Sequence, residues 1–144
     1  MKKLFVLVLV FVLTMGVPMS RAAAHQEQQE AAAETQIVSW DNWRAAKLKA
    51  EEFDGNGQYI EALQHYLEYI RQAEGLDRPD IVAWGKNNAA YMIIKRQKQD
   101  PTVDLAPARQ MLEEGLAIGQ ATEDCRKVLE SNLAYVKMFL RSIP

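Results

Sequence analysis

From about residue 40 onward, apolar residues recur at spacings of three and four, in segments separated by short breaks that contain glycine or proline. In the first segment, Trp43, Ala46, Ala50 and Phe53 fall on one face of a helix. Valine, isoleucine and threonine form no alternating runs, so no strand is expected. The pattern predicts an all-α fold with five helices, at about residues 41–53, 58–75, 77–94, 104–119 and 122–140.

The breaks between these segments carry residues that start helices. Asp77 is predicted to cap the third helix, with Pro79 in its first turn, where an amide needs no partner. Asp104 and Thr122 are predicted to cap the fourth and fifth helices. Short connections force neighbouring helices to run antiparallel, so we expect stacked helical hairpins.

The second helix carries an apolar stripe made of Ile60, Leu63, Tyr66, Leu67 and Ile70. The spacing of these residues predicts that they share the face toward the core. The same argument predicts a stripe on the fifth helix, made of Val128, Leu129, Asn132, Leu133, Val136 and Leu140.

The break after the first helix, "DGNG", resembles a calcium-binding loop because Asp54 and Asn56 alternate with glycines. In the two frames that fit, the slot for a bidentate glutamate holds Leu63 or His65, and neither supplies that carboxylate. A helix reversal explains the sequence better. We expect both glycines to take positive φ, and Asp54 and Asn56 to bond to the nearby backbone.

The N-terminus has the pattern of a secretory signal peptide. Two lysines precede an apolar run at residues 4–13, and the small residues Ala22 and Ala24 follow it. We predict a signal peptide at residues 1–24, with an uncleaved membrane anchor as the alternative. In both cases the rest of the chain is exported, so the protein is expected to be secreted or periplasmic, or N-terminally anchored and facing outside. We expect contact with the membrane only through this segment, if it is not cleaved.

After the signal peptide, residues 25–38 form a polar spacer rich in Gln, Glu and Ala, predicted to be disordered. Residues 39–144 form the predicted helical domain, which is large enough for a core without disulfides. Cys125 is the only cysteine. We expect a half-buried thiol that packs as a small hydrophobe, with an intermolecular disulfide as the alternative.

The charge of the exported chain argues against two classes of partner. Without residues 1–24, the chain keeps 14 basic against 19 acidic side chains, a net charge of −5. No basic stripe interrupts this acidic balance, so nucleic acid is excluded as an expected partner, and anionic lipid is disfavoured.

An internal repeat is visible in the helical region. "NNAAY" at residues 87–91 returns as "SNLAY" at residues 131–135, and a weaker echo, "KAEEF", ends at Phe53. The second helices of the two hairpins also match, in "YIEALQHY" and "LAPARQML".

These motifs resemble the tetratricopeptide-repeat (TPR) family. "GQYIEALQHY" is similar to the turn and second helix of that family, and "AWGKNNAAY" to its first helix, with Trp84 and Tyr91 in the aromatic slots. The resemblance implies a TPR-like stack of about two and a half repeats that binds a peptide or protein on its surface. The repeated motifs do not decide the register of the third and fifth helices, that is, which of their residues occupy the inward positions of the repeat. The register decides whether Tyr91 and Tyr135 pack inside or face a groove.

The sequence offers no set of residues arranged for catalysis, no metal-ligand spacing and no phosphate loop, so we expect no enzyme, no cofactor and no metal site. The candidate partner-binding residues are Trp84, Asn87, Asn88, Tyr91, Asn132 and Tyr135. For the aromatic residues the alternative is ordinary helix packing, and for the asparagines it is a hydrogen bond to the neighbouring helix.

The function expected from these features is an exported protein–protein interaction module that performs no catalysis. One alternative is a self-associating structural bundle of the cell envelope, which includes a homodimer. A further alternative is a small-ligand carrier or enzyme with a pocket near His65 or Cys125.

Overall fold

The computed structural model describes residues 37–141. Within this range there are five α-helices and no strands: α2 (Trp40–Gly55), α3 (Tyr59–Gly75), α4 (Pro79–Gln99), α5 (Ala106–Ala117) and α6 (Glu123–Arg141). The predicted signal peptide, and the predicted spacer up to residue 36, lie outside the described residues.

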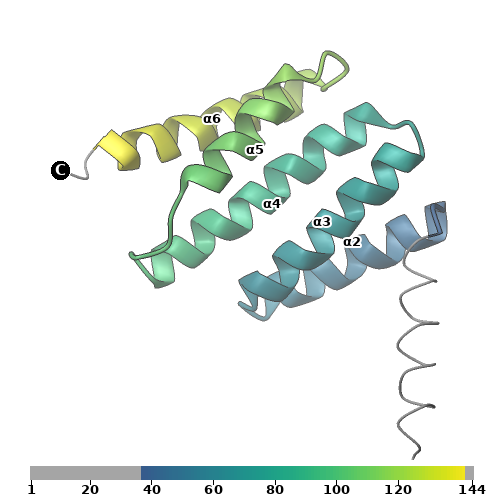
Figure 1. Cartoon of the computed structure of the whole chain (residues 1–144), viewed down its shortest axis with the longest axis horizontal. Coiled ribbons are helices and arrows are strands. Elements are labelled where there is room, and N and C mark those ends of the chain that lie inside the picture. Colours follow the sequence, from purple (N-terminus) through teal and green to yellow (C-terminus); the bar gives the residue numbers. More distant parts are fainter. Residues whose placement is uncertain (1–36, 142–144) are drawn as a thin grey trace, which may run out of the picture. The chain divides into compact units, whose positions relative to one another are not determined.

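The helices pack in the order of the sequence. Each helix from α2 to α5 contacts the next one, and successive helices run in opposite directions (Figure 1). In addition, α4 contacts α6 directly. The predicted all-α stack of antiparallel hairpins is therefore confirmed.

The turn between α2 and α3 differs in detail from the prediction. Only Gly57 takes a positive φ, of 74°, while Gly55 still belongs to the end of α2. The Asp54 carboxylate does not bond to the local backbone, because both its oxygens accept hydrogen bonds from Lys95 Nζ, at 2.6 and 2.8 Å. The expected local role of Asp54 was wrong: a cation on α4 offers a stronger partner than a neighbouring amide.

At the start of the third helix, Pro79 lies in the first turn as predicted, but the predicted cap at Asp77 was wrong. Asp77 takes a left-handed conformation with a φ of 52°, and the residue at the cap position is Arg78, which makes no side-chain capping bond. The chain needs a left-handed residue to reverse direction between α3 and α4, and aspartate tolerates that conformation. The predicted cap at Thr122 is confirmed, because Thr122 Oγ1 accepts from the Cys125 amide at 3.2 Å. The predicted cap at Asp104 is off by one residue: Leu105 occupies the cap position of α5, and Asp104 Oδ1, one residue earlier, accepts from the Ala106 amide at 2.8 Å.

The core consists of two clusters that meet at α4. The N-terminal cluster joins α2, α3 and α4 through alanines and aromatic rings, among them Ala50, Ala62 and Tyr69. The C-terminal cluster joins α4, α5 and α6 through aliphatic side chains such as Leu112 and Leu129.

Three residues predicted to face the core are exposed instead. Ile60 is 48% exposed, Leu67 45% and Val128 38%. On α3, Ala62 and Ile70 occupy the buried face, and Ile60 and Leu67 lie to one side of it. The two predicted stripes included too many residues, because every large hydrophobic residue in the pattern was assumed to be buried. Isolated exposed hydrophobic residues are common on protein surfaces.

Candidate partner-binding surface

The six predicted partner-binding residues lie on α4 and α6, the two helices that touch without being neighbours in the sequence. Trp84, Asn87, Asn88 and Tyr91 belong to α4, and Asn132 and Tyr135 belong to α6. The structure therefore brings them into one region, although they differ in how far they are accessible.

A chain of three asparagines joins the two helices. Asn87 is buried, with 5% of its surface exposed, and its Oδ1 accepts a hydrogen bond from Asn132 Nδ2 at 2.9 Å. Asn87 Nδ2 in turn donates to Asn88 Oδ1 at 3.3 Å. The side chain of Asn87 thus follows the alternative interpretation, a bond between neighbouring helices that fixes their register.

The two ends of this chain remain open. In the part of the chain that the structure describes, Asn88 Nδ2 donates no hydrogen bond and Asn132 Oδ1 accepts none. Both residues are partly exposed. Because one end is a donor and the other an acceptor, the pair matches the C=O and N–H groups of a bound backbone.

Tyr91 faces outward, which answers the question of register for α4. The residue is 37% exposed, and Lys95 Nζ lies 4.9 Å from the centre of its ring. The same ammonium group lies 5.5 Å from the Tyr59 ring and pairs with Asp54. Lys95 therefore stabilises the position of the Tyr91 ring, and Lys95 itself is held by Tyr59 and Asp54.

Tyr135 and Trp84 are less available than Tyr91. Both are partly buried and pack against the C-terminal cluster. One face of Tyr135 meets Lys98 Nζ, which lies 5.1 Å from the ring centre. Lys98 is exposed. The arrangement gives the region an aromatic and cationic character within an acidic domain.

The internal repeat does not place equivalent residues in equivalent surroundings. Ala90 is completely buried, whereas Ala134, its counterpart in the repeat, is exposed. The reason is that α4 is covered by α3 on one side and α5 on the other, while α6 is the last helix of the stack.

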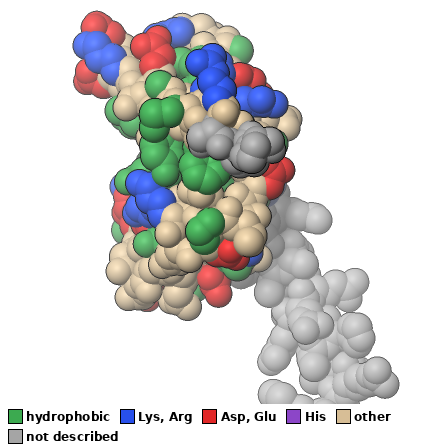
Figure 2. Space-filling view, turned by 90° about the vertical axis from the view of Figure 1, so that its left-hand side faces the viewer, with side chains coloured by type: hydrophobic (Ala, Val, Ile, Leu, Met, Phe, Trp, Pro, Cys, Tyr) green, Lys and Arg blue, Asp and Glu red, His purple; other side chains and the backbone are tan. Residues whose placement is uncertain are grey.

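Figure 2 views the molecule from the side at which α4 and α6 end. Hydrophobic side chains gather in the middle of this face, and charged side chains of both signs surround them. Such a face offers apolar contact at its centre and polar contacts at its edge, as protein–protein interfaces do.

The sequence analysis did not identify Tyr59, Lys95 and Lys98 as residues of this surface, although the spacing of the two lysines indicates that they share a helix face with Tyr91. Lys95 and Lys98 follow Tyr91 by four and seven residues, a spacing that places all three on one face of a helix. Tyr59 could not be found in this way, because only the packing of α3 against α4 brings it to Lys95.

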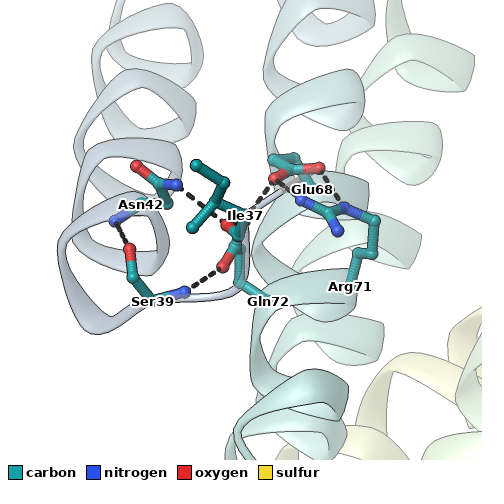
Figure 3. A network of polar contacts seen from close by, with 6 residues as sticks. All are labelled: Ile37, Ser39, Asn42, Glu68, Arg71 and Gln72. Carbon is teal, nitrogen blue, oxygen red and sulfur yellow. Dashed lines mark hydrogen bonds and ion pairs between the residues drawn. The ribbon is translucent and has the colours of Figure 1, made fainter. Parts of the chain in front are cut away.

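A second polar network, also missed, surrounds the buried Gln72 on α3 (Figure 3). Gln72 Oε1 accepts from the Ser39 amide at 2.9 Å, and Gln72 Nε2 donates to the Ile37 carbonyl at 2.9 Å. Nε2 also donates to Glu68 Oε1 at 2.8 Å, and Arg71 holds that carboxylate by two hydrogen bonds. Ile37 and Val38, counted in the predicted spacer, therefore lie fixed on α3.

The two alternative site residues lie in ordinary packing environments. The His65 ring stacks on Phe53 at 5.3 Å with an interplanar angle of 6°, and burial, with Lys49 nearby, lowers the pKa of His65. Cys125 is completely buried rather than half-buried, and burial raises the pKa of its thiol. An intermolecular disulfide would require α6 to leave its place in the core.

Within residues 37–141, no group of three or more His, Cys, Asp and Glu side chains is placed to hold a metal ion. No helix in the same range is long and apolar enough to span a bilayer. No protein-family model, curated protein or solved structure matches this chain.

Proposed function

We propose that this chain is an exported, TPR-like protein–protein interaction module that binds an extended protein or peptide segment across α4 and α6. The proposal follows from one observation above all: the open amide groups of Asn88 and Asn132 lie on the same two helices as the outward-facing Tyr91. A donor, an acceptor and an aromatic anchor on a rigid support are the elements of peptide recognition.

The chemistry of each group suggests a role. Tyr91 offers a large contact area at a small cost in rotamer entropy. Asn88 Nδ2 donates to a carbonyl of the bound segment, and Asn132 Oδ1 accepts from one of its amides. Lys98 carries an exposed cation next to Tyr135, so it favours a partner with an acidic group in reach.

The N-terminal region determines where this binding occurs. In this proposal residues 1–24 direct export, and the polar spacer separates the domain from the membrane or from the mature N-terminus. The function is passive, since binding energy comes from burial on a preformed helical surface and no bond is made or broken.

The proposal is tested with the full chain, exported by its own cell and used as bait in an envelope extract. We expect Tyr91→Ala and the double variant Asn88→Ala/Asn132→Ala each to lose partners that the wild type retains. Leu67→Ala is the matched control, because Leu67 is an exposed apolar residue on α3, and it should retain the same partners. Identical catches from all four baits, with unchanged helical content, would exclude this surface as the binding site.

A further inference from the structure

One face of α6 is left uncovered by the rest of the stack. Helices α4 and α5 pack against the opposite face, which carries the buried Leu129, Leu133 and Val136. Met138 is the most exposed large hydrophobic residue within 37–141, at 66%, and Val128 is 38% exposed. The uncovered face comprises Asp124, Lys127, Val128, Ser131, Ala134, Met138 and Arg141.

The sequence of this face is self-complementary when two copies of α6 are placed antiparallel. The small residues Ser131 and Ala134 lie at its centre, where they allow two helix backbones to approach closely. Asp124 lies seven residues before Ser131, and Arg141 lies seven residues after Ala134. A twofold axis between Ser131 and Ala134 therefore places Asp124 of each copy opposite Arg141 of the other.

The apolar residues fit the same arrangement. Val128 and Met138 lie between the centre and the two ends. The same twofold places Met138 opposite Lys127 of the other copy, one residue from Val128. The face also has a shallow hollow, lined by Ala134, Lys137, Met138 and Arg141, that can receive an apolar side chain. The contact then has an apolar middle and two opposite charge pairs at its ends.

The charges at these ends are available for a partner. In the part of the chain that the structure describes, neither Asp124 nor Arg141 forms an ion pair, and both are exposed. Other charges of the two end helices are already paired within their own helix, and on α6 Lys127 pairs with Glu123 at 2.7 Å. On α2, Arg44 pairs with Asp41 at 3.1 Å and Lys47 pairs with Glu51 at 2.9 Å, within the same helix. Asp124 and Arg141 are thus opposite charges that a second copy of α6 can pair.

We propose that two copies of this chain form a twofold dimer through antiparallel packing of their α6 helices. The interface lies on α6 next to Asn132 and Tyr135 of the proposed partner-binding surface, and it does not include Tyr91 on α4. Because one helix face is small compared with a standard protein interface, the association is weak and depends on concentration.

Sedimentation of the full chain over a range of concentrations tests the dimer. We expect Asp124→Arg and Arg141→Asp each to weaken dimerisation by about tenfold or more, because like charges then meet at both ends of the interface. The double variant Asp124→Arg/Arg141→Asp restores opposite charges and should recover the dimer. Asp41→Arg is the matched control, since it makes the same change in the first turn of α2 and should leave the dimer intact.

Several results would overturn the proposal: a wild type that stays monomeric at all concentrations, single variants that dimerise normally, or a double variant that does not recover. Cross-linking tests the direction of packing. Chains with Ser131→Cys mixed with chains with Ala134→Cys should cross-link faster than either variant alone, and equal rates would exclude the antiparallel register. Tyr91→Ala should still dimerise, which separates a failure of this inference from a failure of the proposed function.

Discussion

The two halves of the stack fill the space between their helices with different kinds of residue. Between α2 and α3, the fully or almost fully buried residues include Ala46, Ala50 and Ala62, and the rings of Tyr66 and Tyr69 fill the remaining space. Between α5 and α6, leucine and valine side chains interdigitate. In the first half the backbones approach closely over alanine, while in the second half long aliphatic side chains fill the gap.

This difference changes what each half is sensitive to. The aliphatic half depends on volume, so it should respond most to the loss of methyl groups. The aromatic half contains the buried residues Tyr66 and Tyr69 and the polar network of Gln72, so it should respond to pH and to the loss of hydrogen bonds. Four predictions test this contrast, beginning with the largest expected effect.

Leu129→Ala should produce the largest loss of stability. Leu129 is completely buried in the C-terminal cluster, and truncation leaves a cavity that surrounding residues fill only in part. We expect the free energy of unfolding to fall by about 2–5 kcal/mol. Urea unfolding measures this change, and Leu67→Ala on the exposed side of α3 should stay within about 0.5 kcal/mol of wild type. A loss below about 1 kcal/mol for Leu129→Ala would show that the aliphatic half can collapse around the deletion.

Alkaline pH should destabilise the aromatic half specifically. Burial raises the pKa of Tyr66 and Tyr69 to about 12, whereas an unfolded tyrosine ionises near pH 10. Their stabilising contribution is therefore complete below about pH 10 and is lost as the pH rises toward 12. The loss amounts to at most about 3 kcal/mol for each residue.

Unfolding experiments between pH 8 and pH 12 measure this loss. Replacing both residues by phenylalanine should flatten the pH profile, since nothing buried in that cluster then ionises in this range. Tyr91→Phe is the control, because Tyr91 is exposed and its replacement should leave the profile unchanged. A profile that remains as steep in the double variant would assign the alkaline loss to other groups.

The sequence predicts the helical framework that both halves of the stack share. Apolar spacing predicted five helices and their order, and the cap at Thr122 was found from residue type alone. These features depend on neighbours within a few positions along the chain, so a local pattern is enough to find them.

The sequence could not predict contacts that only packing creates. Asp54 and Lys95 are 41 residues apart, and Gln72 lies 35 residues from the carbonyl it holds. The hydrogen bonds of the candidate partner-binding surface also could not be predicted from the sequence. Residue type identified Asn87 and Asn132, but only the geometry shows that they bond to each other and leave Asn88 and Asn132 with open groups.

Loss of the Gln72 side chain should have a moderate effect. Gln72→Ala leaves the Ser39 amide, the Ile37 carbonyl and Glu68 Oε1 without their partner, and water reaches these part-buried groups only incompletely. We expect a loss of about 1–3 kcal/mol. Gln72→Met keeps the volume without the hydrogen bonds, so it separates the two contributions. Hydrogen exchange at the Ser39 amide should accelerate in both variants, and unchanged protection would show that Gln72 does not hold this segment.

The smallest expected effects come from two buried helical glycines, Gly85 at the contact of α4 with α3 and Gly115 at the contact of α5 with α6. A Cβ at Gly85 would lie 2.5 Å from Ile70 Cγ1 and 2.9 Å from the Tyr69 ring, and a Cβ at Gly115 would lie 2.9 Å from Leu129 Cδ2. A rigid ring cannot move aside, whereas a terminal methyl group shifts with a small rotation. Alanine also gains about 1 kcal/mol over glycine in a helix.

We therefore expect Gly85→Ala to be destabilising by about 1 kcal/mol, after a packing cost of about 1–3 kcal/mol is offset by helix propensity. Gly115→Ala should be close to neutral, because the methyl group of Leu129 yields. Thermal unfolding of both variants compares the halves, since the substitution is the same and the neighbouring side chains differ. Equal losses at both positions would mean that an aliphatic interface is as rigid as one filled by rings, which would remove the physical basis of the contrast between the two halves.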